Sequence, residues 1–216
     1  MEFKDLWEYD PVIGTWTEKT PFQGVSRYFG TSFVINGEVY AGLGVTTNNT
    51  TEYDYLRDFY RYNPVADTWT RIADFLGPRI GSLAFSIGNK GYIGGGKAWN
   101  SNQYSTFWEY DTVLDTWSEI PNPGVDDSFG VGFSYKDRGY ALLERELWEL
   151  DISNGFTWTQ KATFPIGELD KAVCFVLGIT LMWEQDLLET VRIGASSSMI
   201  YKMIPGLRSN PLKNSN

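Results

Sequence analysis

A motif of paired aromatic residues recurs four times along the chain at a nearly regular spacing. The copies read DLWEYDPVIGTW, DFYRYNPVADTW, TFWEYDTVLDTW and, more weakly, ELWELDISNGFTW. The tryptophans that close these copies are Trp16, Trp69, Trp117 and Trp158, and they lie 53, 48 and 41 residues apart. A repeat of this length is typical of a chain built as an array of similar units, so we expect a repeat architecture.

A second shared block lies between successive copies of the aromatic motif. It reads GTSFVINGEVYAGLG over residues 30–44, GSLAFSIGNKGYIGGG over 81–96 and GVGFSYKDRGYALLE over 130–144. Each block has an apolar segment, a short polar turn with glycine, and a second segment that carries a tyrosine, which predicts a β-hairpin. The hairpin and the aromatic motif together give four short strands per unit, and this predicts the blade of a β-propeller.

These features resemble the kelch repeat, whose marks are a double glycine followed by a tyrosine and a tryptophan at a fixed separation. The resemblance covers residues 5–178, so we assign 1–178 to kelch blades. It implies an all-β fold, a β-propeller of four-stranded kelch blades in an incomplete ring, with about three full blades and a partial blade at each end. It also implies that the tyrosines and tryptophans pack between neighbouring blades. The third block departs from the pattern because Ala141, Leu142 and Leu143 replace the glycine pair.

Residues 179–216 break the repeat, and we expect them to form an aberrant tail. Met182 and Trp183 each have a single codon, and reading one base earlier across them and Glu184 gives Val-Gly. The neighbouring codons then allow the kelch-like strand Asn-Ala-Tyr-Val-Gly-Thr-Gly. We interpret the tail as a frameshifted remnant of the next blade, and a genuine divergent tail is the alternative.

The composition argues against two classes of partner. The chain has a net charge of −9 and a pI of about 4.6, without the basic stripe of a nucleic-acid-binding protein. It has no apolar run of the roughly 18 residues that a membrane-spanning helix needs.

The style of the repeats resembles bacterial kelch proteins of the envelope-associated type, which implies an extracytoplasmic or cell-envelope location.

The absence of histidine limits the chemistry that the chain can perform. Galactose oxidase is also built from kelch blades, but its copper site needs two histidines and a Cys-modified tyrosine. We therefore expect no cofactor, no metal site and no catalytic residues, and we predict a non-enzymatic module that binds a protein or a carbohydrate. The alternative is a fragment of a propeller enzyme acting on sugars, such as a sialic acid epimerase, which needs only acid–base groups.

Loops on one face of the propeller are the predicted binding site. The loops that join second to third strands emerge there, and two of them, residues 45–57 and 97–106, are long. They combine amides and hydroxyls with aromatic rings, which fits carbohydrate stacking or protein contacts, although solvated loops folded onto the blade edge are the alternative. The candidate ligand-binding residues on these loops are Tyr53, Tyr55, Arg57, Trp99, Asn102 and Tyr104.

Two arginines complete the predicted site. Arg27 and Arg79 occupy equivalent places just before the innermost strands, where they could line the central channel and meet an acidic ligand. The alternative is a structural role in which they pair with blade carboxylates such as Asp10 or Asp111.

Overall fold

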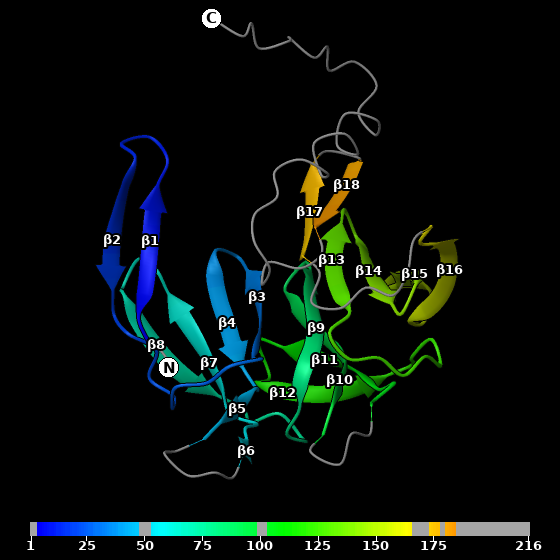
Figure 1. Ribbon diagram of the computed structural model, residues 1–216, viewed down its shortest axis with the longest axis horizontal. Helices are drawn as coiled ribbons and strands as arrows, with labels where there is room; N and C mark the ends of the chain where they lie inside the picture. Colours follow the sequence, from blue (N-terminus) through cyan, green and yellow to red (C-terminus); the bar gives the residue numbers. More distant parts are fainter. Residues whose placement is uncertain (1–3, 48–52, 99–102, 166–172, 178–179, 185–216) are drawn as a thin grey trace, which may run out of the picture.

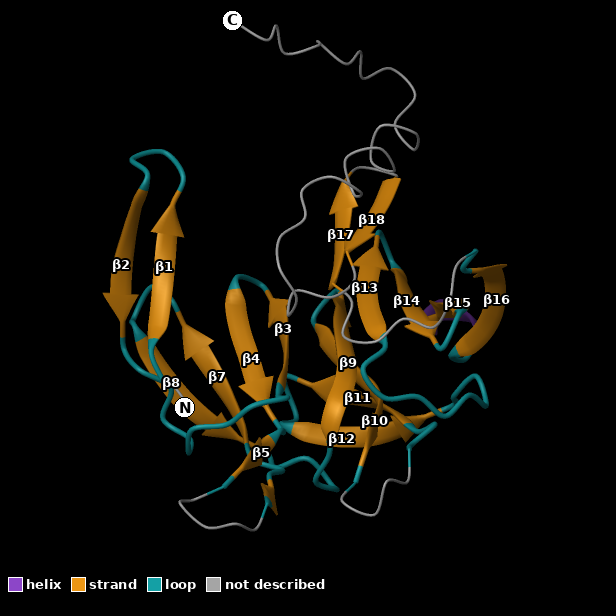
Figure 2. Ribbon diagram, in the orientation of Figure 1, coloured by secondary structure: helices purple, strands orange, loops and turns teal. Residues whose placement is uncertain are grey.

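The computed structural model of the chain describes residues 4–47, 53–98, 103–165, 173–177 and 180–184. These residues form strands joined by loops, and the helix drawn in Figure 2 is the single 3-10 turn of the described part, Ile152–Asn154. The predicted all-β class is therefore confirmed.

Three four-stranded antiparallel sheets make up the body of the described part of the chain, and each is one blade. The first blade contains β3 (Thr31–Ile35), β4 (Glu38–Gly42), β7 (Phe59–Asn63) and β8 (Thr68–Ile72). The second contains β9 (Ile80–Ile87), β10 (Lys90–Lys97), β11 (Phe107–Asp111) and β12 (Thr116–Ile120). The third contains β13 (Val131–Tyr135), β14 (Arg138–Leu143), β15 (Glu146–Asp151) and β16 (Thr157–Thr163). Within each blade the strands pair in chain order, as the repeat predicts.

Partial blades flank these sheets. The hairpin of β1 (Leu6–Asp10) and β2 (Thr15–Lys19) precedes the first blade, and the hairpin of β17 (Val173–Leu177) and β18 (Thr180–Glu184) follows the third. Figure 1 shows the sheets following one another from the β1–β2 hairpin at the left to the third blade at the right. This arrangement confirms a propeller of four-stranded blades. Strand β18 lies within the segment that we assigned to the tail, and residues 185–216 lie outside the described part, so the frameshift stays a prediction.

The first strands of the blades lie together at the propeller axis. Strand β9 contacts both β3 and β13, and β13 contacts β17. Backbone hydrogen bonds join the segments that lead into these strands: the Gly81 amide donates to the Phe29 carbonyl over 3.3 Å, and the Phe129 amide donates to the Gly81 carbonyl over 2.7 Å. Neighbouring blades are therefore linked through their backbones as well as their side chains.

In the second and third blades, a glycine before the repeated tyrosine makes room for the preceding blade. A Cβ at Gly91 in the second blade would meet the Phe33 ring of the first blade at 2.2 Å, and a Cβ at Gly139 would meet the Phe85 ring at the same distance. A side chain at either position would force the sheets apart, because packed interiors leave no such space. The Gly-Tyr pair of the repeat thus marks the position where an aromatic ring of one blade packs against the backbone of the next.

The repeated tryptophan fastens each blade to the one before it. In the second blade, Trp117 Nε1 donates to the Ala73 carbonyl at the end of the first blade over 3.0 Å. Asp115 accepts the Ala73 amide over 2.9 Å and the Tyr110 hydroxyl over 2.8 Å. One residue of the preceding blade is therefore held at both its N–H and its C=O. We call this arrangement the Trp–Asp clamp.

The clamp recurs with variations along the chain. In the first blade, Trp69 donates to the Thr20 carbonyl over 3.0 Å, and Asp67 accepts the Thr20 amide over 2.9 Å. In the third blade Trp158 donates to a carbonyl of the second blade over 2.8 Å, but the place of the aspartate is taken by a phenylalanine. The third blade therefore keeps only half of the clamp.

The N-terminal hairpin carries the tryptophan of the repeat without a blade to receive it in the described part of the chain. Trp16 is 64% exposed, whereas Trp69 is 7% exposed. Gly14 stands where the first and second blades have the clamp aspartate. Trp16 therefore serves as an internal control for the other repeated tryptophans.

We predict that Trp117→Phe destabilises the chain by about 1–3 kcal/mol, because it leaves the Ala73 carbonyl without its donor at a partly buried contact. The matched change Trp16→Phe should shift the unfolding free energy by no more than about 0.5 kcal/mol, since its ring is exposed. Urea denaturation followed by fluorescence measures both values. Equal effects of the two changes would contradict the clamp.

Candidate functional site

The long loops between second and third strands are partly held by backbone pairing. Strands β5 (Val45–Thr46) and β6 (Asp54–Tyr55) form a short ladder beyond the end of β4. Tyr28 and Val45 exchange two backbone hydrogen bonds of 3.0 and 2.9 Å, and Tyr104 forms a bridge with Asp127. The segments that enter the first and third blades thus pair with the described ends of these loops.

A groove of about 430 Å³ lies on this face, beside the segment that leads from the N-terminal hairpin into the first blade. It is lined by Gln23, Gly24, Val25, Tyr55, Leu56, Arg57, Asp58, Tyr60, Arg71 and Asp74. The groove brings together two of the predicted ligand-binding residues, Tyr55 and Arg57. The other groups that carry charge along it are two carboxylates and a second arginine.

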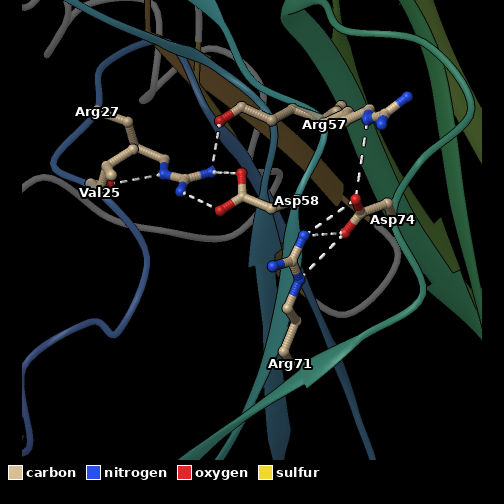
Figure 3. A network of polar contacts seen from close by, with 7 residues as sticks. Val25, Arg27, Arg57, Asp58, Arg71 and Asp74 are labelled. Carbon is tan, nitrogen blue, oxygen red and sulfur yellow. Dashed lines mark hydrogen bonds and ion pairs between the residues drawn. The ribbon is translucent and has the colours of Figure 1, made fainter. Parts of the chain in front are cut away.

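Arg27 and Asp58 form a partly buried ion pair at the inner side of the groove, as Figure 3 shows. The two guanidinium nitrogens donate to the two carboxylate oxygens over 2.8 and 2.7 Å, and Nη1 also donates to the Leu43 carbonyl over 3.1 Å. The Arg27 guanidinium lies 4.7 Å from the centre of the Phe22 ring. This geometry matches the structural alternative for Arg27, with Asp58 as the carboxylate in place of Asp10 or Asp111.

Two opposing effects set the pKa of Asp58. Burial raises the pKa of this carboxyl, but the hydrogen bonds and the charge of Arg27 outweigh burial and hold the pKa below its ordinary value. Asp58 is therefore ionised throughout the neutral range, and its two oxygens are already occupied by the arginine. It serves better as a support for the groove than as a proton donor.

The outer side of the groove carries a more open charge network. Arg71 donates to both oxygens of Asp74 over 2.8 and 3.0 Å, and Arg57 Nε lies 3.8 Å from the same carboxylate (Figure 3). The Arg57 side chain is 65% exposed. Since a contact of 3.8 Å at an exposed site contributes little, Arg57 can turn to an incoming ligand at small cost.

Arg79 is buried beneath the second long loop. Its guanidinium donates to the Gly95 carbonyl over 2.9 Å and lies 4.3 Å from the centre of the Tyr104 ring. Burial lowers the pKa of Arg79 to about 10, so the group remains charged at neutral pH. Its Nη2 reaches Thr106, which aligns in the repeat with the Asp58 that binds Arg27 in the first blade. Arg79 thus supports Tyr104 from below.

The remaining predicted residues divide between placed and undescribed ones. The Tyr53 ring lies 6.5 Å from the Tyr28 ring, outside the groove lining. Trp99 and Asn102 lie outside the described residues. Sequence reasoning missed the Asp58 and Asp74 carboxylates. A signal for Asp58 was present, because it directly precedes the third strand of its blade, as Thr106 does in the next.

Within the described residues, no group of three His, Cys, Asp or Glu side chains gathers closely enough to hold a metal ion. No helix in the same residues is long and apolar enough to cross a membrane.

Comparison with known proteins places the repeats among kelch sequences, although no family model matches the chain. The chain is 27% identical over 166 residues to Kelch-like protein terF of Aspergillus terreus, which covers 71% of this chain and 36% of that protein. It is 35% identical over 83 residues to N-acetylneuraminate epimerase of Haemophilus influenzae, which covers 38% of this chain and 22% of that enzyme. The chain thus spans about a third or less of the length of these relatives.

Other matches come from several kingdoms. They include Kelch-like protein 34 of Homo sapiens, an F-box/kelch-repeat protein of Arabidopsis thaliana and a poxvirus kelch protein. The solved structure of YjhT superposes with a TM-score of 0.69 at 16% identity, over 85% of this chain and 72% of that one. This structural likeness concerns the fold. The spread of the relatives does not single out a bacterial origin, which stays an expectation.

We predict that Asp58→Asn lowers the unfolding free energy at pH 7 by about 1–3 kcal/mol, because one of the two hydrogen bonds from Arg27 and the negative charge of the pair are lost. The folded-state pKa of Asp58 is depressed, so this difference from wild type should be full above the ordinary carboxyl pKa and shrink as the pH falls through the depressed value. The difference in unfolding free energy is measured by chemical denaturation from about pH 2 to about pH 7, a range that spans the titration of carboxyl groups. The control Asp74→Asn, whose partners are exposed, should cost no more than about 1 kcal/mol.

Proposed function

The chain belongs to the kelch-repeat β-propeller proteins, and on this premise we propose that it is a non-enzymatic module that binds a protein or a glycan through the loops on one propeller face. The observation that carries the proposal is the groove that holds Tyr55 and Arg57. Its carboxylates are occupied by arginines, while an exposed cation and an aromatic ring remain at its edge.

Rigid support under the loops favours binding over a purely structural role. Arg27 and Arg79 hold the backbone beneath the two long loops through the Leu43 and Gly95 carbonyls. A preorganised loop face loses less conformational entropy when a ligand arrives, so more of the contact energy is available as affinity. Recognition sites commonly consist of polar and aromatic side chains such as those on this face.

The match to N-acetylneuraminate epimerase favours a second candidate function, acid–base catalysis on a sugar. The groove does contain carboxylates and arginines, which are the residue types that such a reaction needs. In the charged turn Glu144-Arg145-Glu146, two of the three side chains have structural partners: Arg145 donates to the Phe164 carbonyl over 2.9 Å and Glu146 accepts from Thr163 over 2.9 Å. We therefore place the enzymatic reading second.

A direct assay separates the two candidates. Anomers of N-acetylneuraminate are mixed with the chain at catalytic concentration, and their interconversion is followed by proton NMR. The binding proposal predicts the spontaneous rate. Acceleration that is abolished by Asp58→Asn or Arg57→Ala would replace the binding proposal with the enzymatic one.

We predict that Tyr55→Ala and Arg57→Ala each weaken binding at least about tenfold, because each removes an edge group of the groove. Binding partners are found first with the wild-type chain, on a glycan array and by crosslinking to candidate proteins, and affinities are then compared. The matched control is Val113→Ser, an exposed residue in a turn at the opposite end of the second blade, which should leave affinity unchanged. Loss of binding in the control as well would contradict a site on the loop face.

A further inference from the structure

Two phenylalanines adopt a backbone conformation that suits glycine. Phe29 and Phe129 have φ of 57° and 66°, in the left-handed region that bulky side chains rarely enter. Each lies two residues before the first strand of its blade, and the equivalent residue of the second blade is Gly81, with φ 63°. Strain of this kind persists where the surroundings impose it, and it gathers at functional sites.

Backbone hydrogen bonds explain the left-handed conformation at these positions, but they do not explain why two of the positions carry phenylalanine. The bonds from Gly81 to Phe29 and from Phe129 to Gly81 join three successive blades, and they fix the turn at all three positions. Glycine satisfies this turn in the second blade without strain. A phenylalanine at the other two positions therefore needs a reason beyond the connection of the blades.

The two phenylalanine rings meet across the second blade. Their centres are 5.3 Å apart in an edge-to-face arrangement, and a Cβ at Gly81 would meet the Phe129 ring at 2.8 Å. The Phe29 ring also contacts Tyr28 at 5.1 Å, and Tyr28 lies 6.5 Å from Tyr53. We call Tyr28, Phe29, Tyr53 and Phe129 the axial aromatic cluster. It lies where the first strands begin, on the loop face.

The cluster is open to solvent and has polar neighbours. Phe29 is 44% exposed and Tyr53 is 48% exposed, so neither residue is buried in the core. Lys97 Nζ lies 5.3 Å from the centre of the Phe129 ring. Next to that ring in sequence, Ser128 accepts a hydrogen bond from Gln103 Nε2 over 3.1 Å at an exposed position. Aromatic surface and hydrogen-bonding groups therefore adjoin each other.

We propose that the axial aromatic cluster binds the pyranose ring of a neutral glycan. This inference rests on the proposed binding function and adds the ligand class. The apolar C–H face of a pyranose can lie on the exposed Phe29 ring, and its hydroxyls can reach the ammonium of Lys97 and the amide of Gln103. The chain carries a net charge of −9, which favours a neutral sugar over an acidic one.

A small ligand suits the size of the cluster better than a protein does. The rings come from three short segments and make contact by their edges, so the aromatic surface is local. A stable protein interface needs well over about 1,000 Å² of buried surface. A single pyranose ring on such a surface should bind weakly, with a Kd of about 1 mM.

The test uses Phe29→Gly in the full chain, because glycine fits the left-handed backbone there and removes only the ring. The probes are methyl β-D-glucopyranoside and a panel of other neutral methyl glycosides, with binding measured by saturation-transfer NMR and titration. We expect the wild-type chain to bind, Phe29→Gly to bind at least about tenfold more weakly with its Tm unchanged or raised, and Phe29→Tyr to retain binding within about threefold.

The outcomes separate this inference from the proposed function. Glycoside binding that needs Arg57 but not Phe29 would overturn the inference and leave the loop-face module standing. The same holds if no neutral glycoside binds while a protein partner does, or if only a glucuronide binds and Phe29→Gly does not weaken it. A large fall in Tm for Phe29→Gly would show that the ring is structural and would also overturn the inference.

Discussion

The structure depends on a contact in which the first and second blades each hold the carbonyl and the amide of a single residue in the sheet before them, while the third blade holds a carbonyl alone. Tryptophan supplies the donor for the carbonyl, and an aspartate two residues earlier supplies the acceptor for the amide. Four-stranded sheets of this size bury too little surface to be stable alone, so the contact between blades decides whether the array holds together. The ring of one blade against the bare glycine of the next adds a second, apolar contact in the same interface.

Because contacts between the blades stabilise the fold, side chains on the loop face are available for other functions. Arg27 and Arg79 lie beneath the loops and bond to backbone carbonyls, so the arginines nearest the axis act as supports. The groups left at the surface are the exposed Arg57 and the strained, half-exposed Phe29. Strain tolerated by a firmly clamped scaffold is the pattern expected of a recognition site.

The sequence predicted the blades because their marks are local in each repeat and return at a regular spacing. Tyr110 and Trp117 are close in sequence, and both face the same interface. The clamp aspartate Asp115 escaped notice because its partner is a backbone amide some forty residues away, which leaves no residue type to recognise. The partner of Arg27 was also missed, since Asp58 lies in the loop beyond the second strand and meets the arginine only when the blade closes. A sequence repeat predicts which positions are equivalent, whereas the contacts between residues of different blades become apparent only from the three-dimensional structure.

Native-state hydrogen exchange tests the clamp most directly. The Ala73 amide follows the end of β8 and donates to Asp115 of the next blade, whereas the Ala66 amide donates only within its own turn, to Asn63. If the clamp holds the blades together, Ala73 exchanges as slowly as the core strand amides, through global unfolding. Exchange of Ala73 at the rate of Ala66 would contradict the account.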